Sequence, residues 1–388
     1  MSLLEKATII TTPTAHSNGT LHSIKGGSVA DFDVVRGSAA TRVNAEGLIE
    51  SVATNIPRID YTTGEGVVLL EPQSTNLCVS SNVLAVVGGG VVTSNSAISP
   101  DGTLNATNVN FNTGINDGAR ISVGGSSAAA STEYTFSFYA KNASGDGTFR
   151  VRLDTNSQAS LVNEEFTATS EWVRYTHTFT TDASATSFGV GSRFRKGTDN
   201  NGVLFYGVQL EALPYATSYI PTSGAIATRL ADSVTGAGDA TTFNSTEGVL
   251  YAEIAKRQDS NDNFILISLN NDASNSDANS VTIGFGNSVN FYVRVKSPSG
   301  DYTSQTILAS SNEFHKIAIR YEQANIGLFI DGIKEATYTG NYLFTQPLDN
   351  LSFDYNGNGT LPFYGKVKAL AVFNEALTDL ELECLTKI

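Results

Sequence analysis

The sequence is poor in cysteine and in charged side chains, and each shortage excludes a class of protein. Its two cysteines, Cys78 and Cys384, lie far apart and show no CxxC spacing. We therefore expect no disulfide framework and no cysteine metal site, as in a protein assembled in a reducing compartment. Charged residues make up 16% of the chain, and 38 acidic against 24 basic residues give a net charge of -14. Charge of this sign disfavours binding to nucleic acid or to an anionic bilayer through the overall field, while local patches can differ.

Long apolar runs are missing as well. No stretch approaches the roughly 20 apolar residues that a membrane-spanning helix needs. The first 15 residues carry Glu5 and Lys6 within a short apolar segment and lack the long apolar core of a signal peptide. The sequence thus predicts no membrane insertion and no conventional secretion.

Motifs of catalysis and cofactor binding are also missing. A glycan-cleaving β-sandwich needs two carboxylates on one strand face, spaced as Glu-x-Asp-x-x-Glu, and this spacing does not occur. The four histidines show no ligand spacing, and there is no Gly-x-Ser-x-Gly elbow or glycine-rich phosphate loop. Asp379, Glu381 and Glu383 lie on a terminal amphipathic stretch, where a solvated face is expected. We predict a protein that is not an enzyme and uses no cofactor or metal; a triad built from distant positions is the catalytic alternative that stays open.

Glycine, serine, threonine and asparagine are abundant instead, with 35 glycines among 388 residues. This composition is typical of many short strands joined by tight turns. A chain of this length exceeds one ordinary domain. We predict an all-β fold of two consecutive jelly-roll β-sandwiches, residues 75–222 and 223–388, after a small extended N-terminal segment, residues 1–74.

The C-terminal block contains two informative motifs. Asp331-Gly332 joins two β runs and tolerates the positive φ angles of a two-residue hairpin turn, and Leu328 and Ile330 share one face of the first run. An apolar strand over Val367–Phe373 then leads to an amphipathic turn or helix over Glu375–Leu382. This arrangement resembles the closing segment of laminin-G and concanavalin-A-like domains.

The middle block alternates apolar and polar residues at strand spacing. A period of two over 133–141 places Tyr134, Phe136 and Phe138 on a core face. Further strands are expected over 149–153, 172–179, 188–195 and 203–211. This layout is similar to the jelly roll of carbohydrate-binding modules, and residues 209–222 resemble the exit from such a module in phage proteins.

Residues 1–74 have too few apolar side chains for a sizeable core of their own, so we expect an attachment or packing segment. Segments 32–50, 57–61 and 70–77 are similar to a segment that recurs in structural proteins of tailed bacteriophages. This resemblance implies a virion protein, a tail fibre or capsid-surface appendage. It also implies that the chain binds other virion proteins, is assembled in the host cytoplasm and forms a homotrimer.

Candidate ligand-binding residues lie in the middle block. If the apolar residues of two strands face the core, alternation places four arginines on the outward face: Arg150, Arg152, Arg193 and Arg195. The apolar residues concerned are Phe149, Val151, Leu153, Phe188, Val190 and Phe194. Tyr139 and Lys141 add to the four arginines from the alternate face of their own strand. Together the six would form a basic, partly aromatic surface suited to sugar carboxylates or phosphates. Alternatively, the arginines pair with acidic groups of a neighbouring domain or subunit, or only solubilise an exposed sheet.

Other candidates have structural interpretations. Trp172, the single tryptophan, is predicted to pack at the start of a strand rather than to stack on a sugar. Tyr292 and Tyr302 could line a groove, but we expect ordinary strand tyrosines. Four loop acids carry oxygen ligands of the type that calcium prefers, yet lack a fixed ligand pattern, so solvated loops are expected: Asp259, Asp262, Asp272 and Asp277.

These patterns and resemblances predict a virion structural protein that adheres to a host-surface glycan. A stand-alone, lectin-like glycan-binding protein is the first alternative. A polysaccharide depolymerase whose carboxylates come from separate strands is the second.

Overall fold

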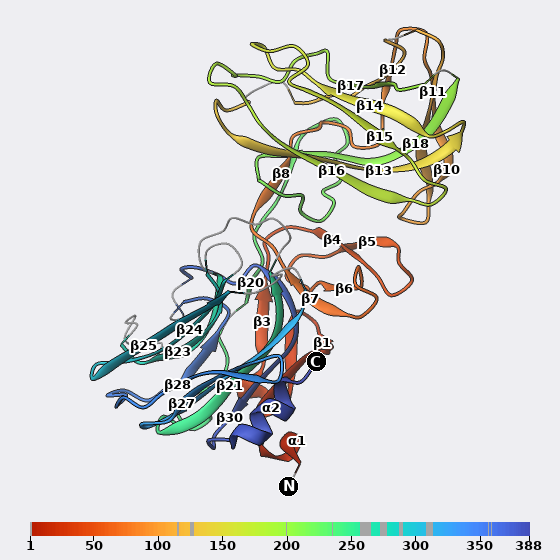
Figure 1. The fold of residues 1–388 in the computed structure, drawn as a ribbon. Coiled ribbons are helices and arrows are strands. Elements are labelled where there is room, and N and C mark those ends of the chain that lie inside the picture. The colour runs from red at the N-terminus through yellow and green to blue at the C-terminus, as the bar shows by residue number, and fades with distance from the viewer. Residues whose placement is uncertain are drawn as a thin grey trace. The chain divides into compact units, whose positions relative to one another are not determined.

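The chain forms two compact units built almost entirely of β-strands (Figure 1). The computed structural model describes residues 2–114, 116–124, 128–198, 200–234, 236–256, 265–271, 278–286, 290–307, 313–355, 357 and 359–388. Unit 1 comprises Met1–Ser38, Val52–Pro72 and Ala231–Ile388, and unit 2 comprises Ala39–Ser51 and Gln73–Leu230. The predicted all-β class with two β-sandwiches is confirmed.

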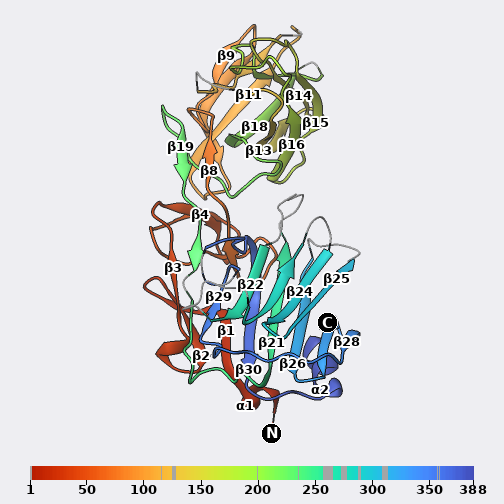
Figure 2. The ribbon, with the colours of Figure 1, turned by 90° about the vertical axis from the view of Figure 1, so that its left-hand side faces the viewer.

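Unit 1 is a sandwich of an 11-stranded and a 5-stranded sheet. The larger sheet runs in the order β20 (Ser233–Val234), β3 (Phe32–Val35), β2 (Thr20–Lys25), β1 (Ala7–Ser17), β30 (Gly365–Phe373), β21 (Glu247–Lys256), β26 (His315–Glu322), β27 (Ile326–Ile330) and β28 (Ile333–Tyr338), with β7 (Val67–Leu70) on β30 and β6 (Ile59–Asp60) on β7. The smaller runs in the order β25 (Gly300–Ile307), β24 (Asn290–Ser297), β23 (Ser280–Phe285), β22 (Ile265–Asn270) and β29 (Asn350–Ser352). Both sheets contribute buried side chains to one hydrophobic core. Figure 1 shows the two sheets as separate layers, and Figure 2 shows the same strands turned by 90°.

The N-terminal residues do not form a segment of their own, which corrects the predicted boundaries. Strand β1 pairs antiparallel with β30, so that Ala7 lies opposite Phe373. Ile9 and Phe32 are fully buried in the core of unit 1. The N-terminal strands have too few apolar side chains to form a core of their own. They bury these side chains by joining the sheet that the C-terminal strands form. The remaining residues of the predicted first block, 39–51 and 73–74, belong to unit 2.

The turn and helix near the C-terminus follow from local sequence. Asp331 and Gly332 have φ angles of +51° and +84°, as the predicted two-residue turn between β27 and β28 requires. Helix α2 (Asp379–Thr386) begins later than predicted because Thr378 caps it: the Thr378 hydroxyl accepts from the Glu381 N–H, and the Glu381 carboxylate accepts from the Thr378 N–H. Besides α2, the described residues form α1 (Leu3–Lys6) and the 3₁₀ turn η1 (Ser28–Ala30), and no helix among them is long and apolar enough to cross a bilayer.

Replacing Gly332 with valine should destabilise unit 1 by roughly 1–3 kcal/mol, since a β-branched residue resists positive φ. Space is not the cause, because a Cβ at Gly332 would meet its nearest neighbour, Lys387 Cα, at 3.5 Å. Gly332→Asn is the matched control and should lose less, because asparagine tolerates this conformation. Urea unfolding measures both. An unchanged unfolding midpoint in the valine variant would show that the turn does not constrain unit 1.

Unit 2 is a second sandwich, of two five-stranded sheets. One sheet, called the inner sheet below, has the order β10 (Val91–Ile98), β11 (Leu104–Phe111), β18 (Asn201–Glu211), β13 (Glu133–Ser144) and β16 (Val173–Thr180). The other, called the arginine sheet, has the order β15 (Val162–Thr167), β14 (Thr148–Leu153), β17 (Arg193–Lys196), β12 (Gly118–Arg120) and β9 (Ala85–Val87). Two short ribbons accompany them, β4 (Ala40–Val43) with β5 (Ile49–Val52) and β8 (Ser74–Asn76) with β19 (Ala227–Arg229).

Aromatic side chains fill the core between the two sheets of unit 2. The prediction that Tyr134, Phe136 and Phe138 share a core face is confirmed, because all three are at most 2% exposed. Phe194 of the arginine sheet stacks on Phe205 of the inner sheet, with ring centroids 4.0 Å apart. This packing fixes the position of the arginine sheet on the inner sheet.

Candidate functional site

Strand register gathers five arginines on the outward face of the arginine sheet. Arg150 lies opposite Arg195, and Arg152 lies opposite Arg193, on the neighbouring strands β14 and β17. Strand β12 adds Arg120 next to Arg193. We call these five residues the arginine face. Between them, Phe149, Val151, Leu153 and Phe194 are fully buried, as the alternation predicted.

Two details of the sequence-based interpretation need correction. Val190 is 84% exposed and does not face the core. The strand expected over 188–195 is shorter, because Phe188 only bridges to Thr155 and pairing with β14 begins at Arg193. Arg120 was missed altogether, since a three-residue strand is too short to show alternation.

The hydrogen-bond partners of the arginine face divide it into two kinds of arginine. Arg152 makes a two-pronged ion pair with Asp154, at 2.7 and 2.9 Å, and Arg150 Nη2 donates to Glu165 at 2.6 Å. By contrast, Arg193 Nη2 donates to the neutral side-chain oxygen of Asn116 at 2.9 Å. Arg195 Nη2 donates likewise to Asn163 at 2.8 Å. Two members of the face therefore have charged partners and two have neutral ones.

Arg193 and Arg195 combine partial burial with repulsion from neighbouring arginines. Burial lowers the pKa of the Arg193 guanidinium, and the charge of Arg152 lowers it further. Burial likewise lowers the pKa of Arg195, with added repulsion from Arg150 and Arg152. Among the described residues, the buried Nε of each has no hydrogen-bond partner. Both remain cations, because arginine stays protonated at physiological pH, so this part of the face favours an incoming anion.

Tyr139 and Lys141 do not join this surface, which corrects the prediction of one surface of six residues. Both lie on β13 of the inner sheet, where Tyr139 pairs with Arg174 and Tyr206. Its ring packs 6.1 Å from that of Tyr206 and lies 5.5 Å from the Arg174 guanidinium. Lys141 Nζ lies 3.9 Å from Glu171. Their role in ligand binding stays a prediction, now separate from the arginine face.

The remaining candidates have mainly structural surroundings. Trp172 is partly buried and packs against a small cluster of Ile49, Tyr206 and Tyr219, as the predicted packing role requires, and its indole N–H donates to the Ile98 carbonyl at 3.1 Å. Tyr292 is buried, and Tyr302 stacks on Tyr338 at 5.1 Å. The loop acids Asp259, Asp262, Asp272 and Asp277 lie outside the described residues. Within the described part of the chain, no three His, Cys, Asp or Glu side chains group as a metal site would require.

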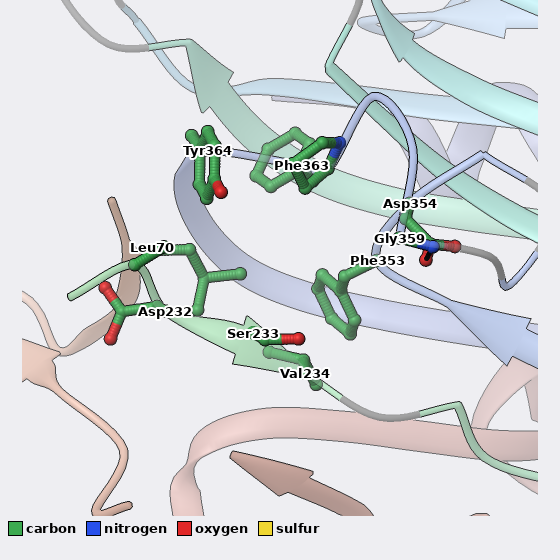
Figure 3. Close-up of a pocket in the computed structure, with 11 residues that line it drawn as sticks. Leu70, Asp232, Ser233, Val234, Phe353, Asp354, Gly359, Phe363 and Tyr364 are labelled. Carbon is green, nitrogen blue, oxygen red and sulfur yellow. Dashed lines mark hydrogen bonds between the residues drawn. The ribbon is translucent and has the colours of Figure 1, made fainter. Parts of the chain in front are cut away.

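A small cavity of about 110 Å³ lies in unit 1 (Figure 3). Leu70, Phe353 and Phe363 contribute apolar walls, and Asp232 and Asp354 lie at its border. Both carboxylates are already occupied, Asp232 by two arginines and Asp354 by Ser352 and two backbone N–H groups. Since ligand pockets usually measure roughly 300–1,000 Å³, this cavity is too small for a sugar ring with its substituents.

A hydrogen-bonded serine, histidine and aspartate also occur in unit 1. His22 Nε2 lies 2.6 Å from Ser17 Oγ, and His22 Nδ1 lies 2.8 Å from Asp31 Oδ2, in the order of a Ser-His-Asp triad. These three residues come from one local stretch and not from the distant positions of the triad that stays open on sequence grounds. Ser17 is exposed, and none of the three lines the described cavity. We therefore base no catalytic assignment on them.

Comparisons with known proteins find one family-model match in each unit. Residues 84–191 match the family model described as "Carbohydrate binding domain", and residues 238–383 match "Concanavalin A-like lectin/glucanases superfamily". No curated protein matches the chain. The first segment contains β12 and β14 of the arginine face, whereas β17 lies just beyond its end.

Several solved structures are similar to parts of the chain. The Ruminococcus gnavus IT-sialidase CBM40 bound to α2,3-sialyllactose is 20% identical, covers 40% of this chain and 92% of its own, and has a TM-score of 0.33. Domain 4 of the Geobacillus stearothermophilus arabinanase AbnA in complex with arabinotriose is 16% identical over 45% of this chain and 82% of its own, with a TM-score of 0.32. The NanB sialidase of Streptococcus pneumoniae is 12% identical over 38% of this chain and 25% of its own, with a TM-score of 0.32. The family models establish that the chain contains a carbohydrate-binding domain followed by a concanavalin-A-like lectin/glucanase domain.

Proposed function

We propose that this protein binds a glycan through unit 2 and that the arginine face is the binding surface. The proposal rests on one observation. The carbohydrate-binding match covers strands β12 and β14, and the register aligns their outward-facing arginines with Arg193 and Arg195 of the adjacent strand β17. Among the described residues, the Nε of each of these two has no hydrogen-bond partner. Arginine presents its donors in a planar fork that fits paired oxygen acceptors. A rigid sheet also holds these donors in place, so little ordering is needed when a ligand binds.

The biological setting that we propose is the surface of a phage virion. Here the chain is a tail-fibre or capsid-surface appendage that adheres to host-surface glycan, is assembled in the host cytoplasm as a homotrimer, and has other virion proteins as partners. Support comes from the similarity of segments 32–50, 57–61 and 70–77 to structural proteins of tailed phages. The protein binds its glycan without cleaving it, in keeping with the commitment of Asp154 and Glu165 to ion pairs.

A stand-alone lectin is the alternative that the two carbohydrate-related matches favour. Light scattering of the purified full-length chain separates the two settings. A stable trimer supports a virion appendage, whereas a monomer that binds glycan supports the lectin.

Replacing Arg150, Arg152, Arg193 and Arg195 together with serine should abolish detectable binding on a glycan array and weaken attachment to host cells. Arg42→Ser, on β4 of the same unit and paired with Glu50, is the matched control and should bind as the natural chain does. Unchanged glycan binding with impaired assembly would show that the arginines form a subunit interface instead. Release of reducing ends from a bound polysaccharide would show a depolymerase.

A further inference from the structure

Three arginines of the face form a continuous row across neighbouring strands. Arg152 of β14 lies opposite Arg193 of β17, which in turn lies opposite Arg120 of β12. Strands in a sheet lie about 4.8 Å apart, so the backbone of this row spans about 10 Å, perpendicular to the strands. The next row, Arg150 and Arg195, ends at Gly118, which carries no side chain. The row of three therefore extends one strand further toward β9 than its neighbour.

Charge along this row is only partly compensated. Asp154 neutralises Arg152 at one end. Arg193, in the middle, donates to the neutral Asn116 oxygen, and among the described residues its Nε has no hydrogen-bond partner. The charge of Asp154, which is already paired with Arg152, is also attractive to Arg193, and Arg120 at the other end is exposed. Placing like charges on adjacent strands is unfavourable, and sugar hydroxyls would leave that repulsion in place. Carboxylate, sulfate or phosphate groups would offset it, and hydrogen bonds between charged partners are roughly twice as strong as neutral ones.

We propose that the arginine face selects acidic glycans, with a chain of acidic sugars lying along Arg152, Arg193 and Arg120. This inference rests on the proposed function and adds the class of ligand, its direction across the strands and the participation of Arg120. Two acidic groups carried within a span of about 10 Å can each reach a guanidinium of the row. A neutral glycan of the same backbone offers the face no charge and binds more weakly.

The test uses the full-length chain and calorimetric titration with three probes: tetragalacturonate, its fully methyl-esterified form, and a sulfated tetrasaccharide. Esterification removes the charge and keeps the sugar backbone. We expect the acid to bind at least about tenfold more tightly than the ester, and this preference to shrink as salt rises from about 0.01 to 1 M. The sulfated probe shows whether the row recognises carboxylates alone or acidic groups in general.

Matched variants locate the site. Arg120→Gln with Arg193→Gln should weaken binding of the preferred acidic probe by roughly tenfold or more, since hydrogen bonds to charged groups are lost. Arg42→Gln, on β4 of the same unit, should stay within about twofold. Glu165→Gln should tighten binding, because it frees Arg150 from its ion pair. Arg193→Lys keeps the charge without the fork and should fall between the natural chain and the double variant. Near-ultraviolet circular dichroism confirms that each variant is folded.

The outcomes separate this inference from the proposed function. Equal affinity for acid and ester would overturn the acidic class while glycan binding stands. Full affinity in the folded Arg120→Gln and Arg193→Gln double variant would overturn the location. Binding of none of these probes, nor of any glycan on an array, would overturn the proposed function as well.

Discussion

Replacing Asp232 with alanine is expected to lower the free energy of unfolding of unit 1 by about 3–5 kcal/mol, because it leaves buried cations without their shared carboxylate. Asp232 Oδ1 accepts from Arg36 Nη1 at 2.9 Å, and Oδ2 accepts from Arg58 Nη2 and from the Glu71 N–H. Arg58 Nη1 donates in turn to Glu71 Oε2 at 2.7 Å. All four side chains are at most 3% exposed.

The size of this effect follows from charge balance. Two guanidinium groups and two carboxylates make the natural cluster neutral, and removing Asp232 leaves one positive charge in excess inside the protein. Arg36 keeps its bonds to three backbone carbonyl oxygens, of Ser38, Ala53 and Ile56, but these dipoles do not replace a carboxylate. Burial lowers the pKa of Arg36, and the hydrogen bond and charge of Asp232 are the largest effects that raise it.

Calorimetric unfolding measures the loss, and hydrogen exchange in β1, β3 and β7 assigns it to unit 1. Glu335→Ala, at an exposed position of β28, is the control and should change stability by less than about 0.5 kcal/mol. The double variant Asp232→Ala with Arg36→Ala should lose less than the sum of its two single variants, since the two side chains interact directly. Additive losses, or a loss below about 1 kcal/mol for Asp232→Ala, would mean that the cluster does not hold unit 1 together.

Replacing Phe194 with alanine should destabilise unit 2 by about 3–5 kcal/mol, because a fully buried ring is lost and a cavity remains. Its ring stacks on Phe205 at 4.0 Å and meets the edge of Phe138 at 5.1 Å. Since Phe194 lies between Arg193 and Arg195 on β17, its loss should also loosen the arginine face and weaken glycan binding. Trp172 fluorescence follows unfolding of unit 2 specifically, because the chain has a single tryptophan.

Two further variants control this experiment. Phe194→Leu keeps most of the buried volume and should lose clearly less than the alanine variant. Val190→Ala should change stability by less than about 0.5 kcal/mol, because Val190 is 84% exposed. If the Val190 variant were the more damaging one, the original expectation that Val190 faces the core would be restored.

Features of the candidate site differed in how far they could be predicted. The outward orientation of Arg150 and Arg152 could be predicted from the alternation of β14 alone. The position of Arg152 opposite Arg193 could not be predicted in this way, because it depends on the pairing of two strands with 40 residues between these positions, which no local pattern specifies. Tyr139 was assigned to the wrong surface for the same reason: alternation predicts which side of a strand a residue faces, but not the sheet to which the strand belongs.

The sequence by itself determined the all-β class, the core-facing aromatic residues of β13 and the turn at Asp331 and Gly332. These depend on composition, on a period of two and on the backbone freedom of one dipeptide, all of which are local. Only the tertiary structure decided that β1 completes the sheet of β30, that Asp232 neutralises Arg36 and Arg58, and that Arg120 joins the arginine face. Each of these contacts joins residues distant in the chain, and it forms because apolar faces and buried charges must find partners that their own segments do not contain.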